Sequence, residues 1–126
     1  MIIRNASVYT EEGKFAQQDI FIRDELFVDC AAEGGEEQII DASGCIAIPG
    51  LTDIHFHGCM GHDFCDGTRE AIDAMAVYEA SVGVTNIVPA SMTLSQDMLL
   101  GICSTAKAYR EEGVQDKRAH FQGINM

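Results

Sequence analysis

The spacing of hydrophobic residues changes near Pro49-Gly50, and this change most constrains the fold of the chain. Before it, short runs alternate hydrophobic and polar positions and are separated by turn-forming residues, as in β-strands. After it, strand-like runs alternate with two longer segments whose hydrophobic residues recur about every 3.6 positions, as in helices. The sequence therefore predicts a small β unit in residues 1–48 and successive βα units in residues 49–126.

Three stretches of the first part are predicted strands: residues 1–10, 19–30 and 38–48. Within the second stretch, Arg23, Asp24 and Glu25 suit a hairpin bend. The segment between the second and third stretches, AAEGGEEQ, is rich in Glu and Gly and predicts an exposed turn.

The second part alternates strands with helices. A helix is predicted over residues 68–83, with Thr68 as its N-cap, and another over residues 95–113, with Ser95 as its N-cap. In the first helix, the residues predicted to face the core are Ile72, Met75, Ala76, and Tyr78 or Glu79. The predicted strands are residues 51–58, 84–91 and 119–126. This order is typical of right-handed parallel βαβ units, so we expect an α/β fold.

Charge and composition exclude several classes of function. The 126 residues carry a net charge of -12, which repels phosphate backbones and anionic membranes, so we expect neither nucleic acid nor membrane as a partner. No stretch of 18 apolar residues and no signal peptide is evident, which predicts a cytoplasmic protein. The five cysteines form no CxxC pair, a pattern that favours reduced thiols over a disulfide framework.

Two histidines lie one residue apart in PGLTDIHFHG, residues 49–58. Because side chains alternate along a strand, Asp53, His55 and His57 share one face of it. Imidazoles two positions apart on one face can hold a divalent metal such as zinc, and the carboxyl end of a parallel strand is where α/β proteins place their chemistry. We therefore predict His55 and His57 as metal ligands, although a hydrogen-bonded or surface role is the ordinary one for a histidine at a strand end.

The opposite face of that strand, with Thr52, Ile54 and Phe56, is predicted to pack on helices. Weaker site candidates have ordinary structural explanations: Cys59 as a packed thiol, His62 and Asp63 in a solvated turn, His120 at the start of the last strand, and Asp66 and Glu70 near a helix N-terminus. Met75, Met92 and Met98 are predicted to fill the core. No pattern typical of nucleotide binding or of a serine-hydrolase nucleophile is present.

A β unit followed by IPGLTDIHFHG resembles the amidohydrolase superfamily, whose signature at the end of the first barrel strand is matched by Pro49, Gly50, Asp53, His55 and His57. Within it, three further stretches are similar to N-acetylglucosamine-6-phosphate deacetylases: HGCMGHDFCD, ASVGVTNIVPASMT and FQGINM. The signature that contains the two histidines is more specific than these three stretches. In the family the last stretch runs into Glu-Gly-Pro, whose glutamate binds metal.

The resemblance implies a metal-dependent-hydrolase (β/α)8 TIM barrel preceded by strands of a small β-sandwich. Residues 1–48 would supply sandwich strands, and residues 49–126 barrel strands one to three with helices one and two. A complete barrel needs about 250 residues, and the chain ends at Met126 inside an expected buried strand. We therefore expect a fragment that covers about the first third of such an enzyme.

The activity that the resemblance implies is hydrolysis of the acetamide of N-acetylglucosamine 6-phosphate. The reaction would use a divalent metal; we expect zinc, with Fe²⁺ or another ion as the alternative. The partner would be that small amino-sugar phosphate, and the full-length enzyme would be a homodimer. In the family, the catalytic aspartate would fall beyond Met126, so we expect no catalytic residue in this chain and no activity from it alone. We also expect an incomplete metal site. The sequence identifies no substrate-binding residue. Two alternatives stay open: an amidohydrolase acting on a cyclic amide or purine, and a non-catalytic module.

Overall fold

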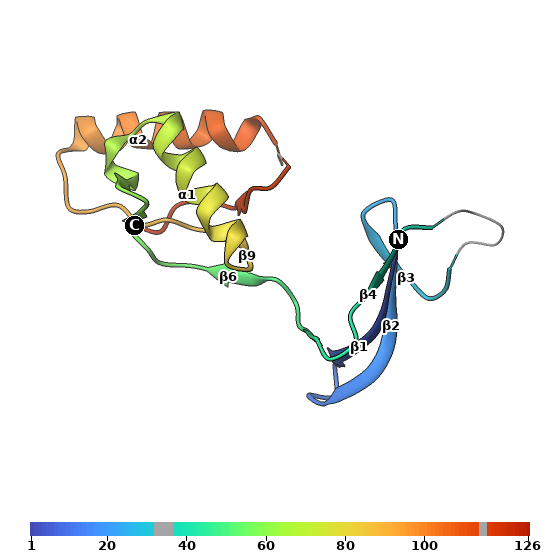
Figure 1. The fold of residues 1–126 in the computed structure, drawn as a ribbon. Coiled ribbons are helices and arrows are strands. Elements are labelled where there is room, and N and C mark those ends of the chain that lie inside the picture. Colours follow the sequence, from blue (N-terminus) through green and yellow to red (C-terminus); the bar gives the residue numbers. More distant parts are fainter. Residues whose placement is uncertain (32–36, 114–115) are drawn as a thin grey trace. The chain divides into compact units, whose positions relative to one another are not determined.

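The computed structural model describes residues 1–31, 37–113 and 116–126. The chain divides into two compact units, Met1–Pro49 and Gly50–Met126 (Figure 1). Most of the predicted exposed turn AAEGGEEQ lies outside the described residues. In the described part of the chain, helices are too short or too polar to cross a bilayer. The assignment of the units to a β-sandwich and a barrel stays a prediction.

The first unit is a mixed sheet. Its strands are β1 (Ile2–Tyr9), β2 (Phe15–Arg23), β3 (Leu26–Val28), β4 (Ile39–Asp41) and β5 (Ile46–Ala47). They pair in the order β3-β2-β1-β4, with β5 also beside β1. The hairpin bend between β2 and β3 falls where the sequence predicts it, with positive φ at Asp24 and Glu25.

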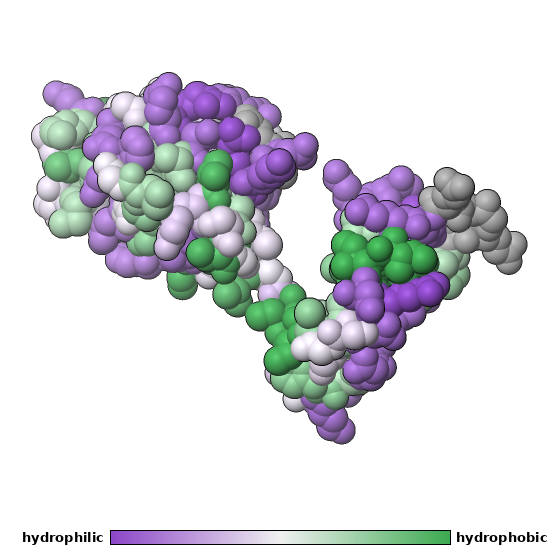
Figure 2. Space-filling view, viewed as in Figure 1, coloured by the Kyte–Doolittle hydropathy of each residue, from purple (hydrophilic) through white to green (hydrophobic). Residues whose placement is uncertain are grey.

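Hydrophobic side chains gather on the surface of this unit (Figure 2). Phe27 is 82% exposed and Leu26 is 68% exposed, both on β3. A hollow of about 560 Å³ is lined by side chains of β1, β2 and β3, Phe21 and Val28 among them, and by residues 47–49. The unit therefore has a large apolar surface relative to its size.

The second unit is a parallel sheet with helices. Its strands β6 (Leu51–Asp53), β9 (Val84–Ile87) and β10 (His120–Phe121) pair in the order β10-β9-β6. Helices α1 (Arg69–Ser81) and α2 (Gln96–Glu111) connect them, and a short hairpin of β7 (Gly58–Cys59) and β8 (His62–Asp63) leads into the 3-10 helix η1 (Phe64–Asp66). The predicted caps are confirmed, because Thr68 accepts a hydrogen bond from Ala71 N and Ser95 accepts one from Met98 N.

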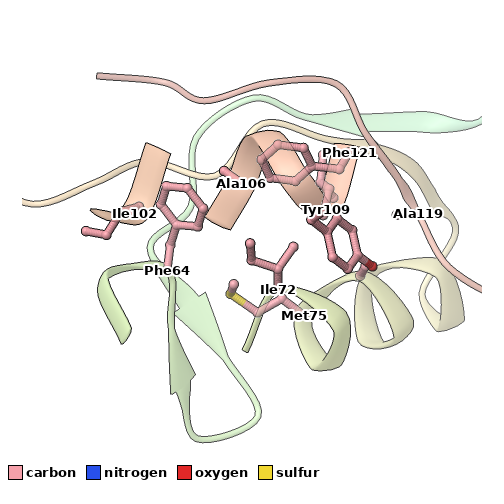
Figure 3. Packing of buried hydrophobic residues seen from close by; sticks show 10 residues of the cluster. Phe64, Ile72, Met75, Ile102, Ala106, Tyr109, Ala119 and Phe121 are labelled. Atoms are coloured by element: carbon pink, nitrogen blue, oxygen red, sulfur yellow. The ribbon is translucent and has the colours of Figure 1, made fainter. Parts of the chain in front are cut away.

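The core of the second unit lies between the helices and the sheet (Figure 3). Ile72 and Met75 of α1 meet Ile102 and Tyr109 of α2, with Phe64 and Phe121 beside them. The rings of Phe64 and Phe121 lie 6.3 Å apart between centroids, and those of Tyr109 and Phe121 lie 5.9 Å apart. Burial of these large side chains is the main stabilising contribution in this unit.

A charged cluster links α1, α2 and the segment before β10 at the edge of this core. The Arg118 guanidinium donates to both carboxylate oxygens of Asp73 at 2.6 and 3.0 Å, and the Tyr109 hydroxyl donates to the same carboxylate at 3.2 Å. Arg69 lies 5.6 Å from the centre of the Tyr109 ring and binds Glu112 at 2.7 Å. Burial and the negative charge of Asp73 raise the pKa of Tyr109 to about 12, so the phenol stays neutral at neutral pH.

Four residues predicted to pack are exposed instead: Thr52, Ile54, Met92 and Met98. Ile54 is 65% exposed, because β6 ends at Asp53 and the face predicted to pack on helices does not continue; Phe56, from the same predicted face, does pack against the core. Met92 and Met98 are 53% and 52% exposed, since one lies in the loop before α2 and the other in its first turn. Met75 is fully buried, as predicted.

Candidate functional site

The two histidines lie just past the carboxyl end of β6. The strand ends at Asp53, whose carboxylate accepts a hydrogen bond from His55 N at 3.0 Å. The chain nevertheless stays extended beside the segment after β9: Val88 N donates to Asp53 O at 2.8 Å, and Ala90 N donates to Phe56 O at 2.7 Å. Both imidazoles are thus held at the edge of the sheet where parallel α/β folds place ligands.

The imidazole rings of His55 and His57 are neighbours, with centroids 5.1 Å apart and planes at 85°. His55 is exposed and His57 is half-buried. The two side chains therefore lie close enough together to act on one ligand, in the arrangement that their spacing along an extended segment predicts.

One hydrogen bond defines the chemistry of His57. Its Nδ1 lies 3.0 Å from the carbonyl oxygen of Ala90. A carbonyl oxygen only accepts, so Nδ1 carries the proton and donates it. In the neutral ring, the lone pair is then at Nε2, which is free to bind a metal ion while the carbonyl fixes the ring.

The loop after the histidines depends on glycine at position 58. β7 and β8 fold back on each other, and a Cβ at Gly58 would lie 2.2 Å from the carbonyl oxygen of His62. Phe64 N donates to His57 O at 2.7 Å, and the Phe64 ring is fully buried in the core. The carbonyl side of His57 is therefore anchored to the core.

The weaker candidates from the sequence have structural roles instead of joining the histidine pair. Cys59 packs partly against the core, and burial, with the negative charge of Glu79, raises the pKa of its thiol; it is therefore a poorer metal ligand at neutral pH. His62 is exposed, with Nδ1 3.9 Å from Asp66, and Asp63 caps η1. The ring of His120 accepts from Gln122 Nε2 at 3.0 Å.

Sequence reasoning missed Asn125. Its side-chain nitrogen donates to Ile54 O at 2.8 Å and contacts His55 Nδ1 at 3.1 Å. Asn125 follows β10, and Ala90, which pairs with it, follows β9. The signal was available, because residues that follow adjacent parallel strands meet at one edge of the sheet.

The donor set fits part of a metal site. Two neutral imidazoles are suitable ligands for zinc and similar divalent ions. In residues 1–31, 37–113 and 116–126, however, no group of three or more His, Cys, Asp or Glu side chains is placed to hold an ion. His55 and His57 could supply half of a four-ligand sphere.

One carboxylate near the site is buried in the core-facing stripe of α1. Glu79 is 7% exposed, and burial followed by the negative charge of Asp53 raises its pKa. The sequence predicts either Tyr78 or Glu79 in this stripe; Tyr78 is 39% exposed, so the stripe uses the glutamate. The charged carboxylate therefore opposes folding at neutral pH.

We expect Glu79→Gln to stabilise the second unit at neutral pH. A raised folded-state pKa means that protonation of Glu79 favours folding fully below the ordinary carboxyl pKa of about 4.3, and that this contribution is lost as pH rises through the raised value. Urea midpoints at neutral and acidic pH test this: the gain should shrink as pH falls. The control is exposed Glu70→Gln in the first turn of α1, which should lose stability slightly; a less stable Glu79→Gln protein at neutral pH would contradict the prediction.

Among known proteins, deacetylases are similar to most of the chain, and dihydroorotases are similar to a shorter part of it. No family model matches it. It is 29% identical over 101 residues to an N-acetylglucosamine-6-phosphate deacetylase of Lysinibacillus sphaericus, which covers 77% of this chain and 26% of the relative. It is 33% identical over 58 residues to a dihydroorotase of Halalkalibacterium halodurans, covering 44% of this chain and 13% of the relative. The chain thus spans about a quarter of the length of the first relative.

Solved structures agree on the fold. An N-acetylglucosamine-6-phosphate deacetylase from Thermotoga maritima has a TM-score of 0.64 at 22% identity, over 89% of this chain and 28% of that one. A Mycobacterium smegmatis N-acetyl-D-glucosamine-6-phosphate deacetylase has a TM-score of 0.71 at 24% identity, over 98% of this chain and 34% of that one. A mutant of the Mycobacterium smegmatis deacetylase, solved in complex with N-acetyl-D-glucosamine-6-phosphate, has a TM-score of 0.70 at 23% identity, over 98% of this chain and 31% of that one. The chain is therefore similar to the N-terminal portion of N-acetylglucosamine-6-phosphate deacetylases, and it has the α/β fold of that portion.

Proposed function

We propose that this chain is part of a metal-dependent deacetylase that hydrolyses the acetamide of N-acetylglucosamine 6-phosphate to glucosamine 6-phosphate and acetate. One observation carries the proposal: His55 and His57 lie side by side at the carboxyl end of β6 in a chain that is similar to such deacetylases. The complex of a structural neighbour with N-acetyl-D-glucosamine-6-phosphate supports the choice of substrate. We place the protein in the cytoplasm, where its five free cysteines would stay reduced.

The chain's own part in this function is to hold two imidazoles ready for a divalent ion. His57 offers Nε2, since Ala90 O holds the Nδ1 proton. When bound, such an ion activates water and polarises the amide carbonyl. We propose zinc, with Fe²⁺ as the alternative, and a dimeric enzyme.

Among residues 1–126, the sequence predicts His55 and His57 as metal ligands and no proton-transferring aspartate. We therefore expect the purified 126-residue chain to release no acetate from N-acetylglucosamine 6-phosphate. Turnover by material whose intact mass matches the 126 residues would contradict this expectation.

We expect the same chain to bind Co²⁺ or Zn²⁺ weakly, and His55→Ala or His57→Ala to remove that binding, because two imidazoles are the fewest that form a chelate. Calorimetric titration measures it. His120→Ala is the matched control, since this imidazole contacts Gln122 and should leave binding unchanged. Binding that survives both His55→Ala and His57→Ala would show that the pair is not the site.

A cyclic-amide hydrolase is the second candidate, favoured by the similarity to dihydroorotases over residues that cover 44% of the chain. The coding sequence after Met126 separates the two: Glu-Gly-Pro supports the deacetylase, and its absence weakens that proposal. A non-catalytic module is the third candidate. This candidate predicts that His55→Ala and His57→Ala both leave the biological role of the protein intact.

A further inference from the structure

Two imidazoles of one candidate site are held by hydrogen bonds of opposite polarity. His57 Nδ1 faces a carbonyl oxygen, and His55 Nδ1 faces an amide nitrogen. We propose that Asn125 is a positioning residue that holds neutral His55 as the Nε2–H tautomer, opposite to His57, and thereby opposes metal binding by His55. The part concerning metal rests on the proposed function, whereas the tautomer does not.

The orientation of the Asn125 amide follows from its two partners. Ile54 O is a carbonyl oxygen 2.8 Å away, so the amide atom that faces it is the donor nitrogen. That same nitrogen lies 3.1 Å from His55 Nδ1 and has a second hydrogen to give. Since an amide nitrogen does not accept, Nδ1 of His55 is the acceptor and Nε2 carries the ring's proton.

The backbone holds Asn125 where this contact is made. Asn125 N donates to Pro89 O at 2.9 Å, and Asn125 O accepts from Ser91 N at 3.3 Å. Ala90 lies between these two residues and supplies the carbonyl that binds His57. The three segments that follow β6, β9 and β10 therefore determine both tautomers together.

Metal binding by His55 must displace this arrangement. Binding through Nδ1 would compete with Asn125 for the same lone pair. Binding through Nε2 would move the ring proton to Nδ1, where it would meet the amide hydrogens, unless the amide turned and left Ile54 O without its donor. His57 pays no such penalty, so the two ligands are unequal.

The tautomers can be read directly by ¹⁵N NMR of the metal-free full chain, well above the ordinary imidazole pKa of about 6.5. We expect a pyrrole-type Nε2 at His55 and a pyrrole-type Nδ1 at His57. In Asn125→Asp, the carboxylate only accepts, so His55 should change to the Nδ1–H form. A wild-type His55 already in the Nδ1–H form, or one unchanged in Asn125→Asp, would overturn the proposal.

Gln122→Glu is the matched control. Gln122 makes the same kind of contact with His120, donating to Asn86 Oδ1 at 2.7 Å and lying 3.0 Å from the ring Nδ1. This change adds the same charge to the same segment of the chain. It should alter the tautomer of His120 and leave that of His55 unchanged; an equal change at His55 would mean that the effect is not local.

Co²⁺ titration tests the consequence for metal. Asn125→Asp should tighten binding by about tenfold, the scale of changes to groups that orient a metal-binding imidazole. Asn125→Ala, which adds no charge and removes the competing donor, should tighten it by less. Weaker binding in Asn125→Ala would overturn the inference, whereas no binding by any variant despite the expected tautomers would overturn the metal pair of the proposed function instead.

Discussion

Phe64→Ala is expected to reduce the unfolding free energy of residues 50–126 by about 3–5 kcal/mol. Phe64 is fully buried, and its ring meets Phe121 and the helices in the core. Truncation would leave a cavity there, and it would also loosen the anchor from Phe64 N to His57 O. Hydrogen exchange of the β9 amides during urea unfolding measures the loss in the second unit alone.

Phe27→Ala is the matched control for this change. The same atoms are removed from a side chain that is 82% exposed, in the first unit. We expect a change within about 0.5 kcal/mol, and none in the exchange of the β9 amides. Equal losses from the two substitutions would show that burial in the described core does not determine stability.

Gly58→Ala should cost about 1–3 kcal/mol and weaken Co²⁺ binding by His55 and His57. The new Cβ would lie 2.2 Å from His62 O, a backbone atom that cannot move without opening the β7–β8 hairpin. Because this hairpin begins at the residue after His57, the shift would reach the imidazole pair. Urea unfolding and metal titration of the same protein would show both effects.

Gly101→Ala is the matched control for Gly58→Ala, and it should change the stability in the opposite direction. Gly101 lies within α2, and in the described part of the chain nothing outside its own stretch of helix lies within 4 Å of the position its Cβ would take. Alanine there should stabilise the chain by about 0.5–1 kcal/mol, with metal binding unchanged. If Gly58→Ala behaved like Gly101→Ala, the close packing of the hairpin would be wrong.

The helices could be predicted because their signals are local. Thr68 and Ser95 each lie directly before a hydrophobic stripe of helical period, and each caps its helix as expected. The position of the histidine pair was predictable for a related reason, since alternation along an extended segment depends on neighbours only. Its role as a metal site is still a prediction.

The ring protons of the two histidines escaped prediction because they depend on residues far apart in the chain. Asn125 and Ala90 set the ring protons of His55 and His57 from 70 and 33 positions away. The exposure of Ile54 was missed because hydropathy does not indicate where Asp53 ends the strand. The first depends on which groups meet after parallel strands are placed side by side, and the second on a side-chain hydrogen bond between residues two positions apart.

The apolar surface of the first unit has a consequence for how this protein behaves in concentrated solution. Hydrophobic area such as Phe27 and Leu26 attracts other copies, while a net charge of -12 repels them. Added salt shortens the reach of that repulsion, from about 30 Å at 0.01 M to about 8 Å at 0.15 M, and leaves the attraction intact. Dilute buffer, not saline, is therefore the medium in which the molecules should stay apart.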